Sequence, residues 1–245
     1  MKRFFHAFAM CQSMFCYIPF PCKVWDEEAR DLMLPMLPFV GLEMGLIWAA
    51  AAWLLRWGSL PPLITGFILA ILPFLMTGFI HLDGYMDVTD AVRSCRDLEK
   101  RRAILKDSHV GSFAVIGMIF LALGQFAVLA SMPENADIWI LAFIPALSRC
   151  GSALAVLILP PMSTSQYAKR EKNWKHIWFI VVTAAVLFSG AFLVCGLEAL
   201  DLLGVVLGYG LALRYGYKNL GGMNGDIAGY SLTCAEFLGL VFWVL

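Results

Sequence analysis

Uninterrupted apolar runs constrain the fold of this chain more than any other feature of its sequence. Residues 60–80 read LPPLITGFILAILPFLMTGFI and include no charged side chain. A helix of roughly 20 apolar residues can cross the ~30 Å hydrocarbon core of a bilayer, because it satisfies its backbone polar groups internally. Several such runs, in a chain of 245 residues that is 60% hydrophobic and 15% charged, predict an all-α integral membrane protein.

The apolar runs predict about seven transmembrane helices in a single membrane domain over residues 1–245. The N-terminal stretch resembles a signal peptide, but His6 and Gln12 interrupt its apolar run and no small-residue cleavage site follows. We expect a partly buried or interfacial helix there, ended by Pro19 and Pro21. The predicted spans are residues 34–55, 60–80, 111–131, 138–159, 177–197, 202–217 and 227–245.

The basic residues predict the orientation of the chain. If the N-terminus is cytoplasmic and the C-terminus lies outside, nearly all basic residues fall in cytoplasmic segments, with Arg56 and Arg149 as the exceptions. The long polar connections are then cytoplasmic too, so we expect the active site at the cytoplasmic face. The basic residues placed inside are Lys2, Arg3, Lys23, Arg30, Arg93, Arg96, Lys100, Arg101, Arg102, Lys106, Lys169, Arg170, Lys172, Lys175, Arg214 and Lys218.

The formal net charge of the chain is zero, which gives no sign of a nucleic-acid partner.

Three aspartates follow the second apolar run, in HLDGYMDVTD. Asp83, Asp87 and Asp90 are spaced i, i+4 and i+7, which places them on one face if the segment is helical. Like charges so placed repel, and a divalent cation such as Mg²⁺ or Mn²⁺ would resolve the repulsion. The alternative is an acidic helix end beside the membrane. Gly84, between them, permits close approach of another backbone or of a substrate.

A second polar segment, KDSHVGS, precedes the third span. Asp107 can add a carboxylate to the aspartate cluster, and Lys106 can balance phosphate charge. Asp107 with Ser108 can equally serve as an N-cap of the following helix. Arg101 and Arg102 are open to the same two interpretations, as phosphate ligands or as ordinary basic anchors at the membrane surface.

Charged residues also occur within the predicted spans. Arg149 lies in the middle of one, where it must face a partner, a cavity or an anionic substrate. Glu43 and Glu236 are at similar depth and are its candidate partners.

The segment KNLGGMNGD breaks the helix before the last span. Its glycines expose backbone N–H groups that suit a phosphate or nucleotide at a helix start, with Asn224, Gly225 and Asp226 nearest to that start. Asp226 can also be no more than the N-cap of the last helix.

Four ordered motifs resemble the cobalamin synthases, the adenosylcobinamide-GDP ribazoletransferase family. They are GFIHLDGYMDVTDAV, ILKDSHVGSFA, LSRCGSAL and LGGMNGDIAGYSLTCAEFLGLVF, and the resemblance covers nearly the whole chain. Cys16-Tyr17 stands where the family usually has Thr-Arg. His109, Asn224 and Thr233 replace the usual Arg, Thr and Glu.

The resemblance implies an Mg²⁺-dependent enzyme of the bacterial inner membrane. The 5′-hydroxyl of α-ribazole, or of its 5′-phosphate, would attack the cobinamide-side phosphorus of adenosylcobinamide-GDP. The products would be adenosylcobalamin, or its 5′-phosphate, and GMP. The likeness leaves open a homo-oligomer or a complex with other enzymes of cobalamin assembly.

The site residues follow from the motif matches. We expect Asp83, Asp87, Asp90 and Asp107 to bind Mg²⁺, with Mn²⁺ as a substitute, and Asp90 or Asp107 to act as general base. The expected substrate contacts are His81, Gly84, Lys106, Ser108, Arg149, Asn224, Gly225, Asp226 and Glu236.

Two other functions compete with this one. A CDP-alcohol phosphotransferase of lipid synthesis also uses aspartates at a membrane face, but its pattern has an Arg soon after the first Asp-Gly, where this chain has Tyr85-Met86. A secondary transporter would explain Glu43, Arg149 and Glu236 within spans, but the chain has no visible inverted repeat.

Overall fold

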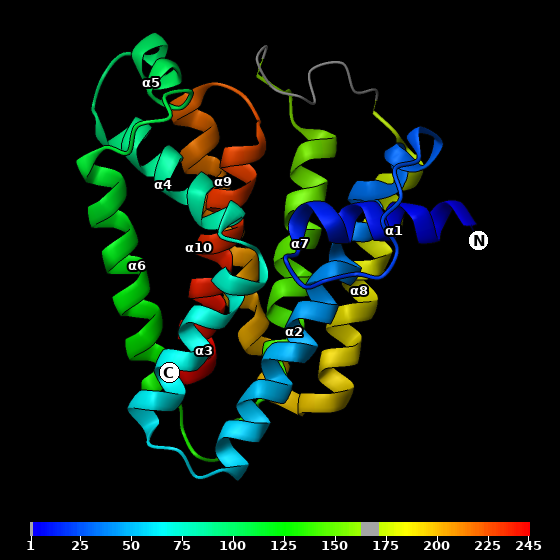
Figure 1. Ribbon diagram of the computed structural model, residues 1–245, viewed down its shortest axis with the longest axis vertical. Helices are drawn as coiled ribbons and strands as arrows, with labels where there is room; N and C mark the ends of the chain where they lie inside the picture. The colour runs from blue at the N-terminus through cyan, green and yellow to red at the C-terminus, as the bar shows by residue number, and fades with distance from the viewer. Residues whose placement is uncertain (1, 163–171) are drawn as a thin grey trace.

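The computed structural model describes residues 2–162 and 172–245, and in these two segments it is helical, with no β-strand. The predicted all-α class is therefore confirmed. The helices, drawn in Figure 1, are α1 (Lys2–Phe15), α2 (Met33–Trp57), α3 (Pro62–Met76), α4 (Ile80–Arg93), α5 (Leu98–Ile104), α6 (Ser112–Ala130), α7 (Ile140–Ile158), α8 (Trp174–Cys195), α9 (Leu203–Leu220) and α10 (Gly225–Val244), with 3-10 helices η1 (Glu27–Leu32) and η2 (Gly196–Leu202).

Five helical stretches of the described chain are long and apolar enough to cross a membrane, or up to six if α3 and α4 together form one broken span. A membrane protein is thus supported, but the count of seven spans stays a prediction. The five stretches are 27–57, Ser112–Ala130, Ile140–Ile158, 174–220 and Gly225–Val244.

The 47-residue stretch 174–220 contains both of the predicted spans 177–197 and 202–217. Its α-helix is interrupted at η2, which begins at Gly196 with a φ of 60°. In Figure 1, α8 and α9 run in opposite directions and η2 joins their lower ends. The predicted break between the two spans is therefore present.

The predicted span over residues 60–80 does not form one continuous helix. Helix α3 ends at Met76, and α4 leaves it at an angle of 91°. Gly78 and Phe79 have φ angles of 57° and 66°, in the left-handed region, where a right-handed helix cannot continue. The N–H of Tyr17, just after α1, donates to the free carbonyl of Met76 at 2.6 Å. The bend thus brings the end of α1 against the start of α4.

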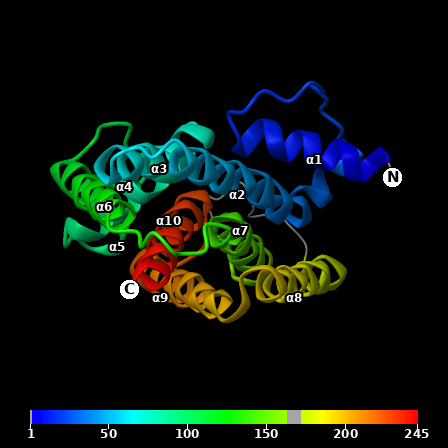
Figure 2. The same cartoon turned by 90° about the horizontal axis from the view of Figure 1, so that it is seen from below.

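Helix α7 is the centre of the bundle. Of the residues in its most apolar stretch, 83% are buried inside the protein, compared with 22% in α6. Figure 2 shows α7 among α2, α8 and α10. Helix α2 approaches it through two glycines: a Cβ on Gly41 would lie 2.4 Å from the Pro145 carbonyl oxygen, and one on Gly45 would lie 2.2 Å from that of Ala142. Such small-residue spacing is typical of close helix pairs in membranes.

Helix α1 lies crosswise to the bundle in Figure 1 and buries one side, including Met10, Cys11 and Gln12. The expected partly buried N-terminal helix is confirmed. It ends at Phe15, however, before the two prolines that were expected to end it.

Basic segments lie at the upper end of the molecule in Figure 1, with α5 beside the end of α9 on the left and the start of α8 on the right. This placement agrees with one cytoplasmic face, although which side faces the cytoplasm stays a prediction. Lys169 and Arg170, which contributed to that prediction, lie outside the described residues.

Candidate active site

The three aspartates of α4 lie on one regular helix, so the predicted spacing places them on one face. Asp83 is exposed, and Asp87 and Asp90 are partly exposed. Val88 and Ala91 are fully buried and hold the other side of α4 against the protein. The helix therefore presents its carboxylates away from its packed side.

Asp226, at the start of α10, joins this group of carboxylates. A Cβ on Gly84 would lie 2.9 Å from the backbone oxygen of Asp226, so α4 and α10 touch where glycine removes the side chain. The carboxylates of Asp83, Asp226 and Asp90 are all close enough to that of Asp87 to repel its negative charge. The backbone contact expected for Gly84 is confirmed, and two helices supply four carboxylates, called here the carboxylate cluster (Asp83, Asp87, Asp90 and Asp226).

Asn224, and not Asp226, caps α10. Its side-chain oxygen accepts from the N–H of Ile227 at 3.0 Å, while its amide nitrogen donates to Asp226 at 2.6 Å. The interpretation of Asp226 as no more than an N-cap is therefore wrong. Asn224 instead orients the Asp226 carboxylate.

The glycine-rich turn before α10 is held from two sides. Arg102 donates to the carbonyl oxygens of Leu220 and Gly221, each at 2.9 Å, which are free at the end of α9. Arg101 donates to Asn219 at 2.8 Å. These contacts favour a structural role for the two arginines over the phosphate role. On the other side, residues 160–162 exchange backbone hydrogen bonds with Met223.

The loop before α6 passes directly over Asp90. A Cβ on Gly111 would lie 2.1 Å from Oδ2 of Asp90, so only glycine fits there. Gly111 also precedes α6 without any side-chain cap, which shows that Asp107 and Ser108 are not its N-cap.

Asp107 is exposed and pairs with His109, whose ring Nδ1 lies 2.6 Å from Oδ1 of the carboxylate. These hydrogen bonds lower the pKa of Asp107 and raise that of His109. Lys106 and Ser108 are exposed on the same loop. Within the described residues, Asp107 is bonded to His109 and no bond joins it to the carboxylate cluster.

The donor set suits a hard divalent cation, since it consists of carboxylate oxygens from one face of α4 and from the start of α10. In the part of the chain that the structure describes, however, no three His, Cys, Asp or Glu side chains are already grouped as metal ligands. Mg²⁺ commonly keeps several waters and uses only one or two carboxylates directly, so the cluster fits a hydrated ion.

Arg149 has the partner that its depth requires. Its Nη1 lies 2.7 Å from Oε1 of Glu236, and the Arg149 side chain is fully buried. Ser148 donates to the same carboxylate oxygen at 2.9 Å. Glu236 is therefore confirmed as a partner. Glu43 forms no ion pair with Arg149 and instead accepts from Gln12 at 3.3 Å.

His81 lies at the start of α4, where the hydroxyl of Thr233 donates to its carbonyl at 3.2 Å. Its ring stacks on Phe15 of α1, with centroids 6.2 Å apart. Sequence reasoning did not place α1 beside His81. The polar residues within its apolar run, Gln12 among them, were the available signal.

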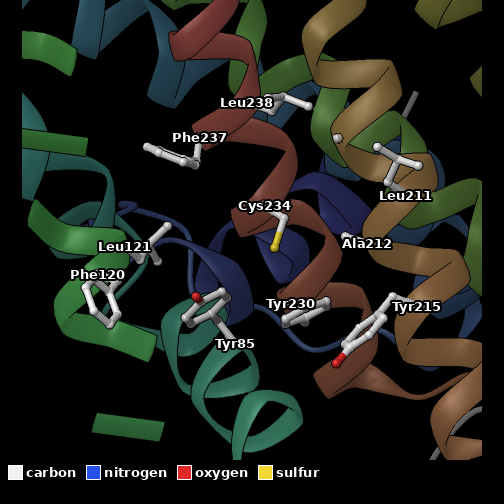
Figure 3. A pocket seen from close by; sticks show the side chains of 11 residues that line it. Tyr85, Phe120, Leu121, Leu211, Ala212, Tyr215, Tyr230, Cys234, Phe237 and Leu238 are labelled. Atoms are coloured by element: carbon white, nitrogen blue, oxygen red, sulfur yellow. The ribbon is translucent and has the colours of Figure 1, made fainter. Parts of the chain in front are cut away.

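An apolar cavity of about 540 Å³ lies beside α4, α6, α9 and α10 (Figure 3). Tyr85 lines it and is two residues, or roughly 200° around the helix, from both Asp83 and Asp87. The rings of Tyr85 and Tyr230 stack with centroids 5.5 Å apart. No charged residue lines the cavity, so α4 separates an acidic face from an apolar one.

The chain is similar to known proteins over nearly its whole length. Residues 7–244 match the family described as Cobalamin-5-phosphate synthase. The chain is similar to an adenosylcobinamide-GDP ribazoletransferase of Clostridium perfringens (strain SM101 / Type A), with 35% identity over 98% of both chains. It is also similar to proteins of that name from Clostridium botulinum (strain Alaska E43 / Type E3), at 34% identity over 98% of this chain and 97% of the relative, and Lachnoclostridium phytofermentans, at 30% over 92% and 88%.

No solved structure matches the chain. The family match extends across every element that forms the carboxylate cluster and the buried ion pair. The chain belongs to the cobalamin-5-phosphate synthase family.

Proposed function

We propose that this protein transfers the adenosylcobinamide phosphate group of adenosylcobinamide-GDP to the 5′-hydroxyl of α-ribazole or α-ribazole 5′-phosphate. The products are adenosylcobalamin, or its 5′-phosphate, and GMP. Its family and the names of its relatives support this step of cobalamin assembly. The observation that carries the proposal is the carboxylate cluster, assembled by α4 and the start of α10.

Asp83, Asp87 and Asp90 would hold Mg²⁺, or Mn²⁺ in its place, together with Asp226 and with Asp107 as a further candidate. The ion would neutralise the diphosphate and the charge that develops on departing GMP. Without such a cation, the carboxylates would repel the diphosphate. The partly exposed position of the cluster leaves room for a substrate oxygen and for water.

Asp90 is the better candidate for the general base. The hydrogen bonds from His109 hold the pKa of Asp107 below its usual range, which makes Asp107 the weaker proton acceptor. In the step, Asp90 takes the hydroxyl proton and the hydroxyl oxygen bonds to the cobinamide-side phosphorus. The bond from that phosphorus to the bridging oxygen breaks, and the electron pair leaves with GMP.

The surrounding residues would position the two substrates. Lys106 and Ser108 extend from the exposed loop, and the turn at Asn224 and Gly225 offers backbone N–H groups at the start of α10. Arg149 and Glu236 would contribute to substrate positioning from deeper in the bundle. We place the end of the molecule that carries the carboxylate cluster at the cytoplasmic face of a bacterial inner membrane, with the N-terminus inside and the C-terminus outside.

The test is GMP release by the purified protein in detergent, given both substrates with and without a divalent cation. We expect release only with the cation, and its loss in Asp87→Asn. Glu134→Gln, which changes an exposed carboxylate in the α6–α7 loop, is the matched control and should keep full activity. Cation-independent release would contradict the metal role, and CMP release from a CDP-alcohol would point to the lipid phosphotransferase instead.

A further inference from the structure

The C-terminal turn of α1 encloses a group of polar atoms that have no hydrogen-bond partner among the described residues. They are Oε1 of Gln12, Oε2 of Glu43 and Nε2 of His81, from α1, α2 and α4. Leaving a buried polar atom unpaired costs about 1–3 kcal/mol, and more for a charged group. Helix α1 contacts both of the other helices, through the Gln12–Glu43 hydrogen bond and the stacking of Phe15 on His81. The three unpaired atoms therefore indicate that a hydrogen-bonding group is needed beside the C-terminal turn of α1.

Helix α1 fixes the geometry of this group. Gln12 is fully buried and its amide nitrogen donates to Oε1 of Glu43 at 3.3 Å. Phe15, one turn later, stacks on the ring of His81. Cys16 lies close enough to both Glu43 and Arg149 to be affected by their charges. One short segment therefore holds Glu43 and His81 in place.

The local charges decide what kind of group fits. The charge of Arg149 is already balanced by Glu236 at 2.7 Å, and Glu43 forms no ion pair with any described residue. With two carboxylates against one guanidinium, a phosphate would be repelled. An uncharged group with N–H or O–H donors would instead pair with the Glu43 carboxylate and the Gln12 oxygen.

The place of the group along α4 connects it to the proposed reaction. His81 is two residues before Asp83, a rise of roughly 3 Å along the helix axis and roughly 200° around it, so the two side chains leave α4 on different faces. A substrate whose diphosphate lies at the carboxylate cluster would reach His81 with a part that extends around the start of α4 toward α1.

We propose that Gln12, Glu43 and His81 form a subsite for an uncharged hydrogen-bond donor of the substrate, a carboxamide N–H or a hydroxyl. Glu43 is the residue that accepts the hydrogen bond, and Gln12 is a positioning residue that holds Glu43. This inference rests on the proposed function. The donor comes either from the carboxamides of adenosylcobinamide-GDP or from the hydroxyls of α-ribazole.

The experiment measures KM for each substrate separately in Glu43→Gln and Gln12→Leu. We expect Glu43→Gln to raise KM for one substrate about tenfold, as for one lost hydrogen bond to a charged group, and to leave the other within about twofold. A rise for adenosylcobinamide-GDP identifies the carboxamides as the donor, and a rise for α-ribazole identifies its hydroxyls. Unchanged KM for both substrates would overturn the subsite.

Two further measurements separate positioning from simple structural support. Gln12→Leu should raise the same KM by a smaller factor, and the double variant should do no more than Glu43→Gln alone, because both changes act through one carboxylate. The affected substrate, added alone with the divalent cation, should raise the melting temperature of the wild type more than that of Glu43→Gln. An equal shift in both would also overturn the subsite. If the wild type released no GMP, the proposed function would fail instead.

Discussion

The protein handles charge in two contrasting ways. In the centre of the bundle, Arg149 and Glu236 neutralise each other at 2.7 Å, and Ser148 and the Pro145 carbonyl add further hydrogen bonds. Along α4 and at the start of α10, Asp83, Asp87, Asp90 and Asp226 come together with no cation among the described residues paired with them.

The two sites differ in charge balance. The charges of the buried pair neutralise each other within the protein. The like charges of the carboxylate cluster repel one another, and an added cation would stabilise them. Each prediction below tests one side of this contrast.

The largest effect on GMP release is expected from Asp90→Asn. Loss of the general base should reduce GMP release by about 10²–10⁴-fold, while the melting temperature stays the same or rises because one repelling charge is gone. Asp107→Asn should reduce release by less than about tenfold, since Asp107 is exposed and bound to His109. A larger loss in Asp107→Asn than in Asp90→Asn would reverse the assignment of the base.

Arg149→Met should destabilise the protein by about 3–5 kcal/mol, because it leaves the Glu236 carboxylate without its partner. The measurement is the free energy of unfolding in detergent. The double variant Arg149→Met with Glu236→Leu should recover much of the loss, since it removes both charges. If the double variant were as unstable as the single one, the pair would not be the self-contained unit described above.

Gly111→Ala tests whether the loop really rests on Asp90. The new methyl group would lie 2.1 Å from the carboxylate, so the loop or the aspartate must move, and we expect about tenfold slower GMP release. Gly210→Ala is the matched control, because nothing lies within 4 Å of that position. Equal activity of the two variants would contradict the close contact.

The smallest effect concerns the exposed pair Asp107 and His109. Their contact raises the pKa of His109 and lowers that of Asp107, so its contribution to stability is lost as pH rises through the His109 pKa or falls through the Asp107 pKa. NMR should give a His109 titration midpoint above the ordinary value of about 6.5, returning toward it in Asp107→Asn. The effect on stability should be small because the pair is exposed.

Much of the site was predictable because it depends on spacing within single segments. The aspartates of α4 share a face since the segment is helical, and Gly84 provides the close backbone contact that its small size permits. Glu236 was a predictable partner for Arg149, as a charge at that depth needs one. The choice between Glu236 and Glu43 was not predictable, because it depends on which helices adjoin α7.

The role of α1 was also beyond the sequence. Its composition predicted a partly buried helix, but not that Phe15 would stack on His81 or that Gln12 would bond to Glu43. The bend after Met76 was missed because residues 60–80 carry no charge, and hydropathy does not register the left-handed backbone at Gly78 and Phe79.

The sequence by itself determined an all-helical membrane protein, the acidic face of α4 and the family to which the chain belongs. These follow from hydropathy, helical period and ordered motifs, which are properties of neighbouring residues. Tertiary structure alone decided that Asp226 joins the α4 aspartates, that Arg102 holds the glycine turn and that α1 adjoins His81. Those contacts join residues distant in sequence, and only the packing of whole helices brings them together.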